Sequence, residues 1–429
     1  MSDYNVVLGL QSTADWSDPN YIPGDWRETI LRFFPNGEAP LTAMLSKLPS
    51  EQTDDYQFNW WTEGLPTQAG AVTDVYTDAA MSAAYAEGDG AAGDVLYAKC
   101  AAAVAKEIRK GHTVQLQDQN VVDGLVVGKV LEVTINGANS QIVIKLLEND
   151  DNAVGHAFDY IQVIGSINPQ GSESPDAISY QPVRDYNYTQ IFRTPLEITG
   201  TVLSQKTRIG DWYQHEKQNA LRMHSIEMEK AFLWGIRYSG TGDNGKPEYT
   251  TRGVIRNITT NKYNYVTATG YSGKTWLQGG SDWIDECLSV LFKYGSDTRL
   301  AYAGVGAIRA INQLAKSEGS IQLRPGTAEY GIKVMEWMTP FGVIYLKRHP
   351  LFSYDAFTTN SILLLEPKNL KYRYMKDRDT HFRPDLQLKK GGWTDKDSIT
   401  EGYLTEAGLE MHIEPTFGFM SGFGQTNTV

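Results

Sequence analysis

An alternation of polar and apolar residues from Asn187 to Thr201 predicts one extended strand. A helical pattern follows from about Asp211 to Trp234, which corresponds to a helix of about 36 Å at 1.5 Å per residue. Its apolar side chains form two faces, whereas an ordinary surface helix has one apolar stripe. We therefore expect cover from two directions, either from two layers of the same subunit or from a contact with another subunit. The first face comprises Tyr213, Ala220, Leu221, Met228, Ala231 and Phe232, and the second comprises Trp212, Met223, Ile226, Leu233 and Trp234.

The residues before this strand predict a long excursion, that is, a segment that leaves the core of the protein and returns to it. A small β subdomain is expected inside this segment. Val133 and Ile135 face Ile142 and Ile144 across a turn at 136–140, which indicates a β-hairpin. Gly, Ala, Thr and Asp dominate residues 64–93, so we expect a loose stretch that buries little. The first fifty residues indicate either an arm that lies on another surface or a segment packed on its own domain. The expected elements are helices at 25–34 and 41–48, strands at 56–62 and between 95 and 164, and a second loose stretch at 168–176.

The residues after the long helix predict a small α/β unit followed by strands. A Gly- and Asn-rich region at 239–281 separates this unit from the helix. The last eighty or so residues read mainly as strands, with Ile362–Leu365 as the most apolar run, and no internal repeat is present. The expected elements are helices at 282–294 and 305–317 and strands at 299–303, near 332–338 and at 342–347.

Composition indicates a globular chain, with 429 residues, 41% hydrophobic and 21% charged, and suggests two or three domains. The net charge of −12 argues against tight binding of a phosphate backbone. The first residues lack a secretory signal and no apolar run reaches the length of a spanning helix, so we expect an intracellular protein outside the membrane. Cys100 and Cys287 are the only cysteines, which excludes a disulfide framework and a four-thiolate zinc site. Because an intracellular protein is not glycosylated at Asn-x-Thr sequons, we expect no glycosylation at Asn187 or Asn257.

Residues 268–275 (ATGYSGKT) match the permissive form of a phosphate-binding P-loop. In such a loop Lys274 would contact the outer phosphates and Thr275 would bind magnesium. A P-loop opens directly into a helix, whereas Gly279 and Gly280 follow here almost at once. We therefore expect that no helix propagates through these glycines and that the loop binds no nucleotide.

Other motifs are weaker. Residues 304–309 (GVGAIR) follow a strand and begin a helix, but Arg309 replaces the third glycine of a dinucleotide fingerprint, so a tight turn is favoured. His412 lacks the paired cysteines of a zinc deaminase, and His215 lacks a second histidine at position 219. The sequence thus supports no enzyme, and we predict no catalytic, cofactor-binding or metal-binding residues.

The order of these elements resembles the major capsid protein of tailed bacteriophages. The stretches that carry the resemblance are 58–63 (FNWWTE), 187–201, 226–235 (IEMEKAFLWG) and 403–410 (YLTEAGLE). The resemblance implies the α+β phage major-capsid fold, with an N-terminal arm, an extended loop carrying the β subdomain, a peripheral domain with a long spine helix, and an axial α/β domain.

The implied boundaries follow the element order. Residues 1–55 would form the arm, 56–186 the extended loop, 187–238 the return strand and spine helix, 239–350 the Gly-rich loop and axial domain, and 351–429 the strands that complete both domains. The excursion is longer than the plain two-stranded loop of the simplest family members. Lys99 and Lys110 lie in it, but no motif marks either as a crosslinking residue, and we predict no crosslink.

The implied function is that of a structural subunit of an icosahedral head, which self-assembles into hexamers and pentamers that enclose double-stranded DNA. The implied partners are other copies of the chain, a separate scaffolding protein, a portal, possibly a decoration protein, and DNA contacted weakly and non-specifically. The virion capsid would be the location, after assembly in the bacterial cytoplasm. The alternatives are a β-rich carbohydrate- or ligand-binding protein and, less favoured, a nucleotide-binding enzyme.

Overall fold

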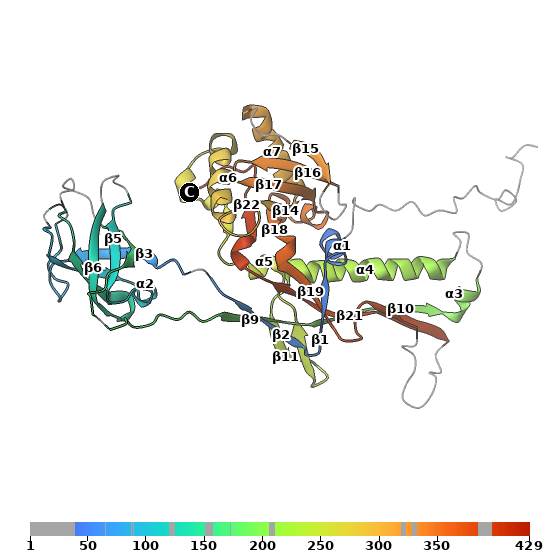
Figure 1. Cartoon of the computed structure of the whole chain (residues 1–429). Helices are drawn as coiled ribbons and strands as arrows, with labels where there is room; N and C mark the ends of the chain where they lie inside the picture. The colour runs from blue at the N-terminus through green and yellow to red at the C-terminus, as the bar shows by residue number, and fades with distance from the viewer. Residues whose placement is uncertain are drawn as a thin grey trace, which may run out of the picture. The chain divides into compact units, whose positions relative to one another are not determined.

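The computed structural model describes residues 39–429 except 65, 87, 89, 120–124, 151–157, 172, 206–210, 319–322, 328–332 and 385–396. The helix expected at 25–34 lies outside these residues. The chain forms two compact units, Trp61–Val183 and the remainder. Both helices and strands are abundant (Figure 1), as the expected α+β class requires.

The unit Trp61–Val183 is built on a closed antiparallel barrel with the strand order β3-β4-β7-β6-β5-β8. Closure leaves no unpaired strand edge. Alternate side chains point inward, so that Val114 and Leu116 are fully buried. The expected hairpin is confirmed, because Val133 pairs with Ile142 across a short 3₁₀ turn. The strands are β3 (Ala69–Tyr76), β4 (Val95–Cys100), β5 (His112–Gln117), β6 (Leu125–Thr134), β7 (Ser140–Leu146) and β8 (Tyr160–Ser166), and helix α2 (Ala102–Lys106) follows β4.

Strand β3 corrects the expectation that residues 64–93 are loose. The pairing of β3 with β4 shifts register between Val72 and Asp74. This bulge places Val72 and Val75 in the same buried core although they are three positions apart. A strict alternation of apolar and polar residues therefore does not reveal this strand. Two inward-pointing valines are enough to place it in the barrel. After β3, Tyr85 is buried and its hydroxyl donates to Asp150 Oδ2 at 2.7 Å, which holds part of the following segment.

Limited proteolysis of the unassembled chain is expected to cut first within residues 168–182. Nearly all of the described residues there are exposed and belong to no helix or strand, so little burial opposes local opening. The barrel strands should resist, and mass spectrometry of the earliest fragments would locate the cut. A first cut between β3 and β4 would contradict this view of the barrel.

The second unit contains a five-stranded sheet in which β10 (Gln190–Thr199) and β21 (Ser398–Met411) pair along their length. Helix α4 (Trp212–Trp234) lies along these two strands (Figure 1) and is capped by Asp211, whose side chain accepts from Tyr213 N. This confirms the expected long helix. The expected strand 187–201 is interrupted, because β9 (Val183–Tyr188) ends before β10 and helix α3 (Gly200–Ser204) begins at Gly200. The remaining strands of the sheet are β1 (Ser50–Thr53), β19 (Leu370–Met375) and β20 (His381–Arg383), while β2 (Gln57–Thr62) pairs with β9.

The two apolar faces of α4 are covered unequally. Phe232 and Met228 of the first face join the core that also contains Phe192 of β10. On the second face Leu233 is buried, whereas Met223 remains 59% exposed. The subunit alone therefore covers the second face only in part.

Helix α1 (Pro40–Leu45) packs on this core, where Leu41 and Met44 are fully buried. The expectation of a helix at 41–48 is thus confirmed in a shorter form. The N-terminal region was expected to be either an arm on another surface or a segment packed on its own domain. For residues 40–53 the second interpretation holds, because α1 and β1 pack on their own unit.

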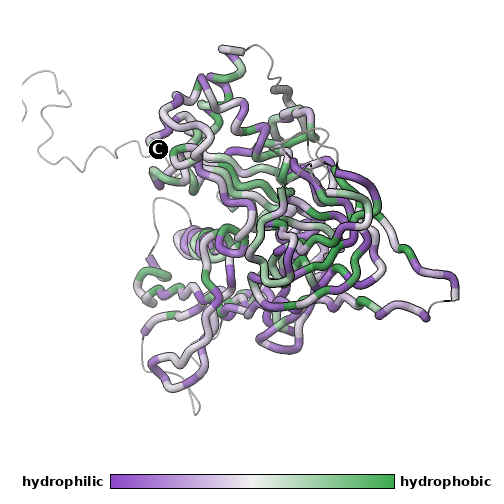
Figure 2. Tube along the Cα trace, turned by 90° about the vertical axis from the view of Figure 1, so that its left-hand side faces the viewer, coloured by the Kyte–Doolittle hydropathy of each residue, from purple (hydrophilic) through white to green (hydrophobic). Residues whose placement is uncertain are grey.

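A seven-stranded mixed sheet forms the other layer of this unit. Its inner strand β18 (Ile362–Leu365) is buried at every position, and Figure 2 shows long apolar stretches along the trace. Helices α6 (Trp276–Leu291) and α7 (Val305–Glu318) pack on it through Trp283, Ile284 and Ile311. The order is β13 (Lys262–Asn264), β22 (Gly418–Ser421), β18, β14 (Thr298–Ala303), β17 (Gly342–Arg348), β16 (Lys333–Thr339) and β15 (Leu323–Thr327), with α5 (Val254–Asn257), α8 (Ala356–Thr359) and the hairpin β11 (Tyr238–Thr241) and β12 (Pro247–Thr250) outside it.

Helix α6 begins six residues before the position expected from the sequence, so the expectation that no helix passes Gly279 and Gly280 is wrong. Each glycine costs a helix about 1 kcal/mol relative to alanine, but both are buried here. A Cβ atom on Gly280 would lie 2.8 Å from the indole of Trp276. Close packing and a capping box at Thr275 offset the low helix propensity.

Candidate functional site

The P-loop lookalike does open into a helix, but its backbone amides are already engaged. Lys274 N donates to Tyr271 O at 3.0 Å, and Tyr271 N donates to Ala268 O at 3.2 Å. The Lys274 carbonyl accepts from Asn427 N, and the Ser272 hydroxyl donates to the carbonyl of Val429. The loop is thus folded on residues near 427–429, and binding of a phosphate by Tyr271 N or Lys274 N would have to displace these internal hydrogen bonds.

Calorimetry with ATP and magnesium is therefore expected to detect no saturable binding, either to the wild-type chain or to the Lys274→Ala variant. The reason is that amides in the loop would have to exchange internal hydrogen bonds for phosphate contacts. Saturable binding that disappears in the variant would contradict this structural account.

The turn at 304–309 is also a packing feature. A Cβ atom on Gly304 would lie 2.2 Å from the carbonyl of Thr359, and one on Gly306 would lie 1.9 Å from Asn360 Oδ1. The chain's own residues occupy the space beside these glycines. This supports the tight-turn interpretation over a dinucleotide fingerprint.

The candidate metal ligands and nucleophiles do not converge. His412 contacts Glu410, and His215 lies 3.1 Å from Asn219. No group of three histidine, cysteine or acidic side chains suitable for a metal ion occurs among the described residues. Burial raises the pKa of Cys100 to about 11, so this thiol stays protonated at neutral pH.

A buried carboxylate fixes α1 on α4. Glu229 Oε1 accepts from Leu41 N at 2.8 Å and lies 2.7 Å from His349 Nε2. Glu229 Oε2 accepts from the backbone N and the hydroxyl of Thr42 at 2.7 and 2.6 Å. Glu229 and His349 are both 0% exposed, so this cluster is a structural lock. No local pattern in the sequence marks Glu229, because its partners lie 120 to 188 positions away.

A buried ion pair fixes two neighbouring inner strands of the seven-stranded sheet. Arg299 Nη1 of β14 lies 2.6 Å from Glu366 Oε2, which directly follows β18. Glu366 also accepts from the hydroxyl of Ser296 at 2.6 Å. The adjoining turn uses Gly295 with a φ of +86°, a conformation that favours glycine.

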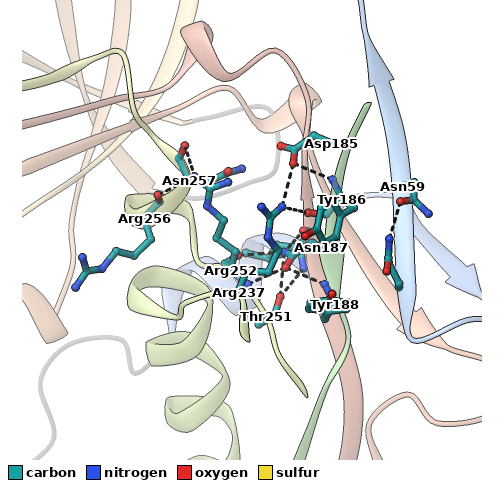
Figure 3. A network of polar contacts seen from close by, with 12 residues as sticks. Asn59, Asp185, Tyr186, Asn187, Tyr188, Arg237, Thr251, Arg252, Arg256 and Asn257 are labelled. Atoms are coloured by element: carbon teal, nitrogen blue, oxygen red, sulfur yellow. Dashed lines mark hydrogen bonds and ion pairs between the residues drawn. The ribbon is translucent and has the colours of Figure 1, made fainter. Parts of the chain in front are cut away.

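A polar network fastens strand β9 beside the β11–β12 hairpin (Figure 3). The Asn187 amide group donates to Thr251 Oγ1 and to the carbonyl of Leu409, and Asn187 Oδ1 accepts from Arg252 N at 2.8 Å. Arg237 pairs with Asp185 at 3.1 Å. Asn187 is 3% exposed, so its sequon is inaccessible in the folded chain.

Large apolar side chains remain uncovered on the second unit. Tyr354 is 73% exposed and Phe357 is 57% exposed, and they lie three residues apart at the start of α8. Leu277 of α6 and Met223 of α4 are also more than half exposed. Exposed aromatic and aliphatic groups of this size are typical of surfaces that contact other proteins. Within the described residues no helix has the length and apolarity that a bilayer crossing requires.

Comparisons with known proteins identify sequences and structures that are similar to this chain. A sequence model of the SU10 major capsid protein family matches residues 9–424. The major capsid protein of Pseudomonas phage PaMx41 is 23% identical over 375 residues, which cover 87% of this chain and 83% of that protein. A solved chain from Mycobacterium phage Cain has a TM-score of 0.46 at 9% identity, covering 98% of this chain and 97% of that chain. A chain from Mycobacterium phage Adephagia has a TM-score of 0.44 at 10% identity, with 98% and 96% covered.

Proposed function

The chain belongs to the SU10 major capsid protein family, and from that premise we propose how its parts serve a phage head. The protein is a structural subunit of a tailed-phage capsid, it has the α+β major-capsid fold, and it assembles with copies of itself in the virion. The match over residues 9–424 carries this conclusion. The ligand-binding alternative is not favoured, and we propose that the subunit has no enzymatic activity.

The units of the fold take distinct roles in this proposal. The insert Trp61–Val183 with its flanking strands serves as the extended loop. The five-stranded sheet with α4 serves as the peripheral domain, and the seven-stranded sheet with α6 and α7 serves as the axial domain. Residues 1–55 serve as the arm, of which residues 40–53 are anchored on their own unit.

The proposed assembly consists of hexamers and pentamers around double-stranded DNA. The uncovered side chains Met223, Tyr354 and Phe357 support lateral contacts between subunits. A net charge of −12 supports weak, non-specific contact with the packaged DNA. A separate scaffolding protein and a portal would complete the head in the bacterial cytoplasm, with a decoration protein as an optional further partner.

Electron microscopy of the purified chain, alone at high concentration and co-expressed with its scaffolding protein, is the direct test. Capsomers or closed shells are expected, because the subunit leaves apolar surface that only association covers. Light scattering on the same samples would give the mass. A monomer under every such condition would overturn the proposed function.

A further inference from the structure

A hollow of about 260 Å³ lies where helices α1 and α4 meet strand β19. Its apolar lining consists of Leu45 of α1, Met228 of α4 and Tyr372 of β19, all three of which are buried. The hollow therefore offers an apolar wall together with a set of oxygen atoms. The residues that complete the lining are Thr42, Ser46, Ser50, Asp379 and Thr380.

Three hydroxyl groups of this lining already use their protons inside the chain. The Thr42 hydroxyl donates to Glu229 Oε2 at 2.6 Å, and the Ser46 hydroxyl donates to a carbonyl of α1 at 2.9 Å. The Tyr372 hydroxyl donates to Asp379 Oδ1 at 2.9 Å. Each of these oxygens keeps lone pairs but has no further proton to donate. The three groups can therefore accept hydrogen bonds from a ligand and cannot serve an anion.

Asp379 adds a negative charge to the hollow. Its Oδ1 accepts from the Tyr372 hydroxyl and from Thr380 N, the latter at 2.7 Å, whereas Oδ2 has no hydrogen-bond donor among the described residues. The neighbouring cation Arg378 pairs with Glu406 instead. Asp379 thus keeps one carboxylate oxygen that can accept from a bound cation.

We propose that this hollow binds a small primary alkylammonium ion. Such a ligand carries one positive charge and three N–H donors, and it has no acceptor that the lining would leave unsatisfied. The ammonium group donates to Asp379 Oδ2 and to lone pairs of the lining hydroxyls, and the alkyl chain lies against Leu45 and Met228. This site goes beyond the proposed function, because it requires no assembly of subunits.

The bound ion connects two separate parts of the fold. Leu45 belongs to α1, whereas Asp379 belongs to the loop between β19 and β20. A ligand that binds only the folded form stabilises that form by mass action. The concentration of small amines in the surroundings therefore controls how firmly α1 is held against β19.

The test is a titration of the unassembled full-length chain with n-butylammonium chloride, followed by saturation-transfer-difference NMR at an ionic strength kept constant with sodium chloride. Saturable binding is expected, with a dissociation constant of about 1–10 mM for a ligand of this size. Two ligands of the same length test the chemistry. 1-Butanol lacks the charge and butyrate carries the opposite charge, so neither should bind saturably over the same range.

Three variants, each checked for folding by urea-induced unfolding, locate the site. Asp379→Asn removes the charge with little change of shape, and Ser46→Leu fills the hollow while every carboxylate stays in place. Each should weaken binding at least tenfold. Asp377→Asn is the matched control, because this exposed residue lies in the same loop, does not line the hollow and has a φ of +59° that asparagine tolerates.

No saturable binding by the wild-type chain, or equally strong binding of 1-butanol, would overturn the proposal. Wild-type affinity in Ser46→Leu, or equal weakening by Asp377→Asn and Asp379→Asn, would do so as well. None of these outcomes bears on the proposed function, which the microscopy of assembled particles tests separately.

Discussion

Replacing Glu229 by alanine is expected to lower the free energy of unfolding by about 3–5 kcal/mol, because it removes a buried carboxylate that accepts three hydrogen bonds from α1. The variant leaves Leu41 N and Thr42 N without their carboxylate acceptor and leaves His349 without its partner. Each unsatisfied buried group costs about 1–3 kcal/mol. Urea-induced unfolding of the unassembled subunit, followed by tryptophan fluorescence, would measure the loss.

Two control variants distinguish the loss of the Glu229 contacts from a general effect of substitutions in this region on stability. Lys230→Ala alters the exposed neighbour of Glu229 and should change stability by less than about 0.5 kcal/mol. Thr42→Ala removes only the hydroxyl donor and should cost about 1 kcal/mol. If Glu229→Ala were no more harmful than Lys230→Ala, the lock would contribute nothing to stability.

Replacing Arg299 by alanine is expected to cause a loss of similar size, about 3–5 kcal/mol, because Glu366 would remain as an unpaired charge that is 4% exposed. A matched double variant, Arg299→Met with Glu366→Leu, removes both charges and keeps apolar volume in their place. Such replacements are often neutral or stabilising, so the double variant should regain most of the lost stability in the same urea experiment. A double variant less stable than Arg299→Ala would show that the hydrogen bonds from Ser296, and not the paired charges, hold this region.

Local sequence patterns predicted those helices and strands whose structure is determined by their own residues. The period of α4 and its cap at Asp211 are both visible in the sequence, and the β6–β7 hairpin follows from alternation on either side of a Gly- and Asn-containing turn. The shift in register in β3 hid a strand, because it moved Val75 out of the expected alternation. In α6 the packing of Trp276 over Gly280 overrode a breaker signal.

The functional surfaces were less predictable for a different physical reason. Glu229 contacts Leu41 across 188 positions, and Arg299 pairs with Glu366 only because β14 and β18 are neighbouring strands. Such groups carry no local spacing that a sequence pattern could reveal.

The pairing of β2 with β9 gives the Trp61–Val183 unit adjacent points of attachment to the remainder of the chain. A closed barrel joined in this way behaves as a cassette, because its core shares no strand with the sheets of the other unit. Evolution can therefore lengthen, exchange or delete the cassette while the rest of the subunit keeps its own fold. The same junctions, near Thr62 and Val183, are natural positions at which to graft a foreign domain for display on a particle.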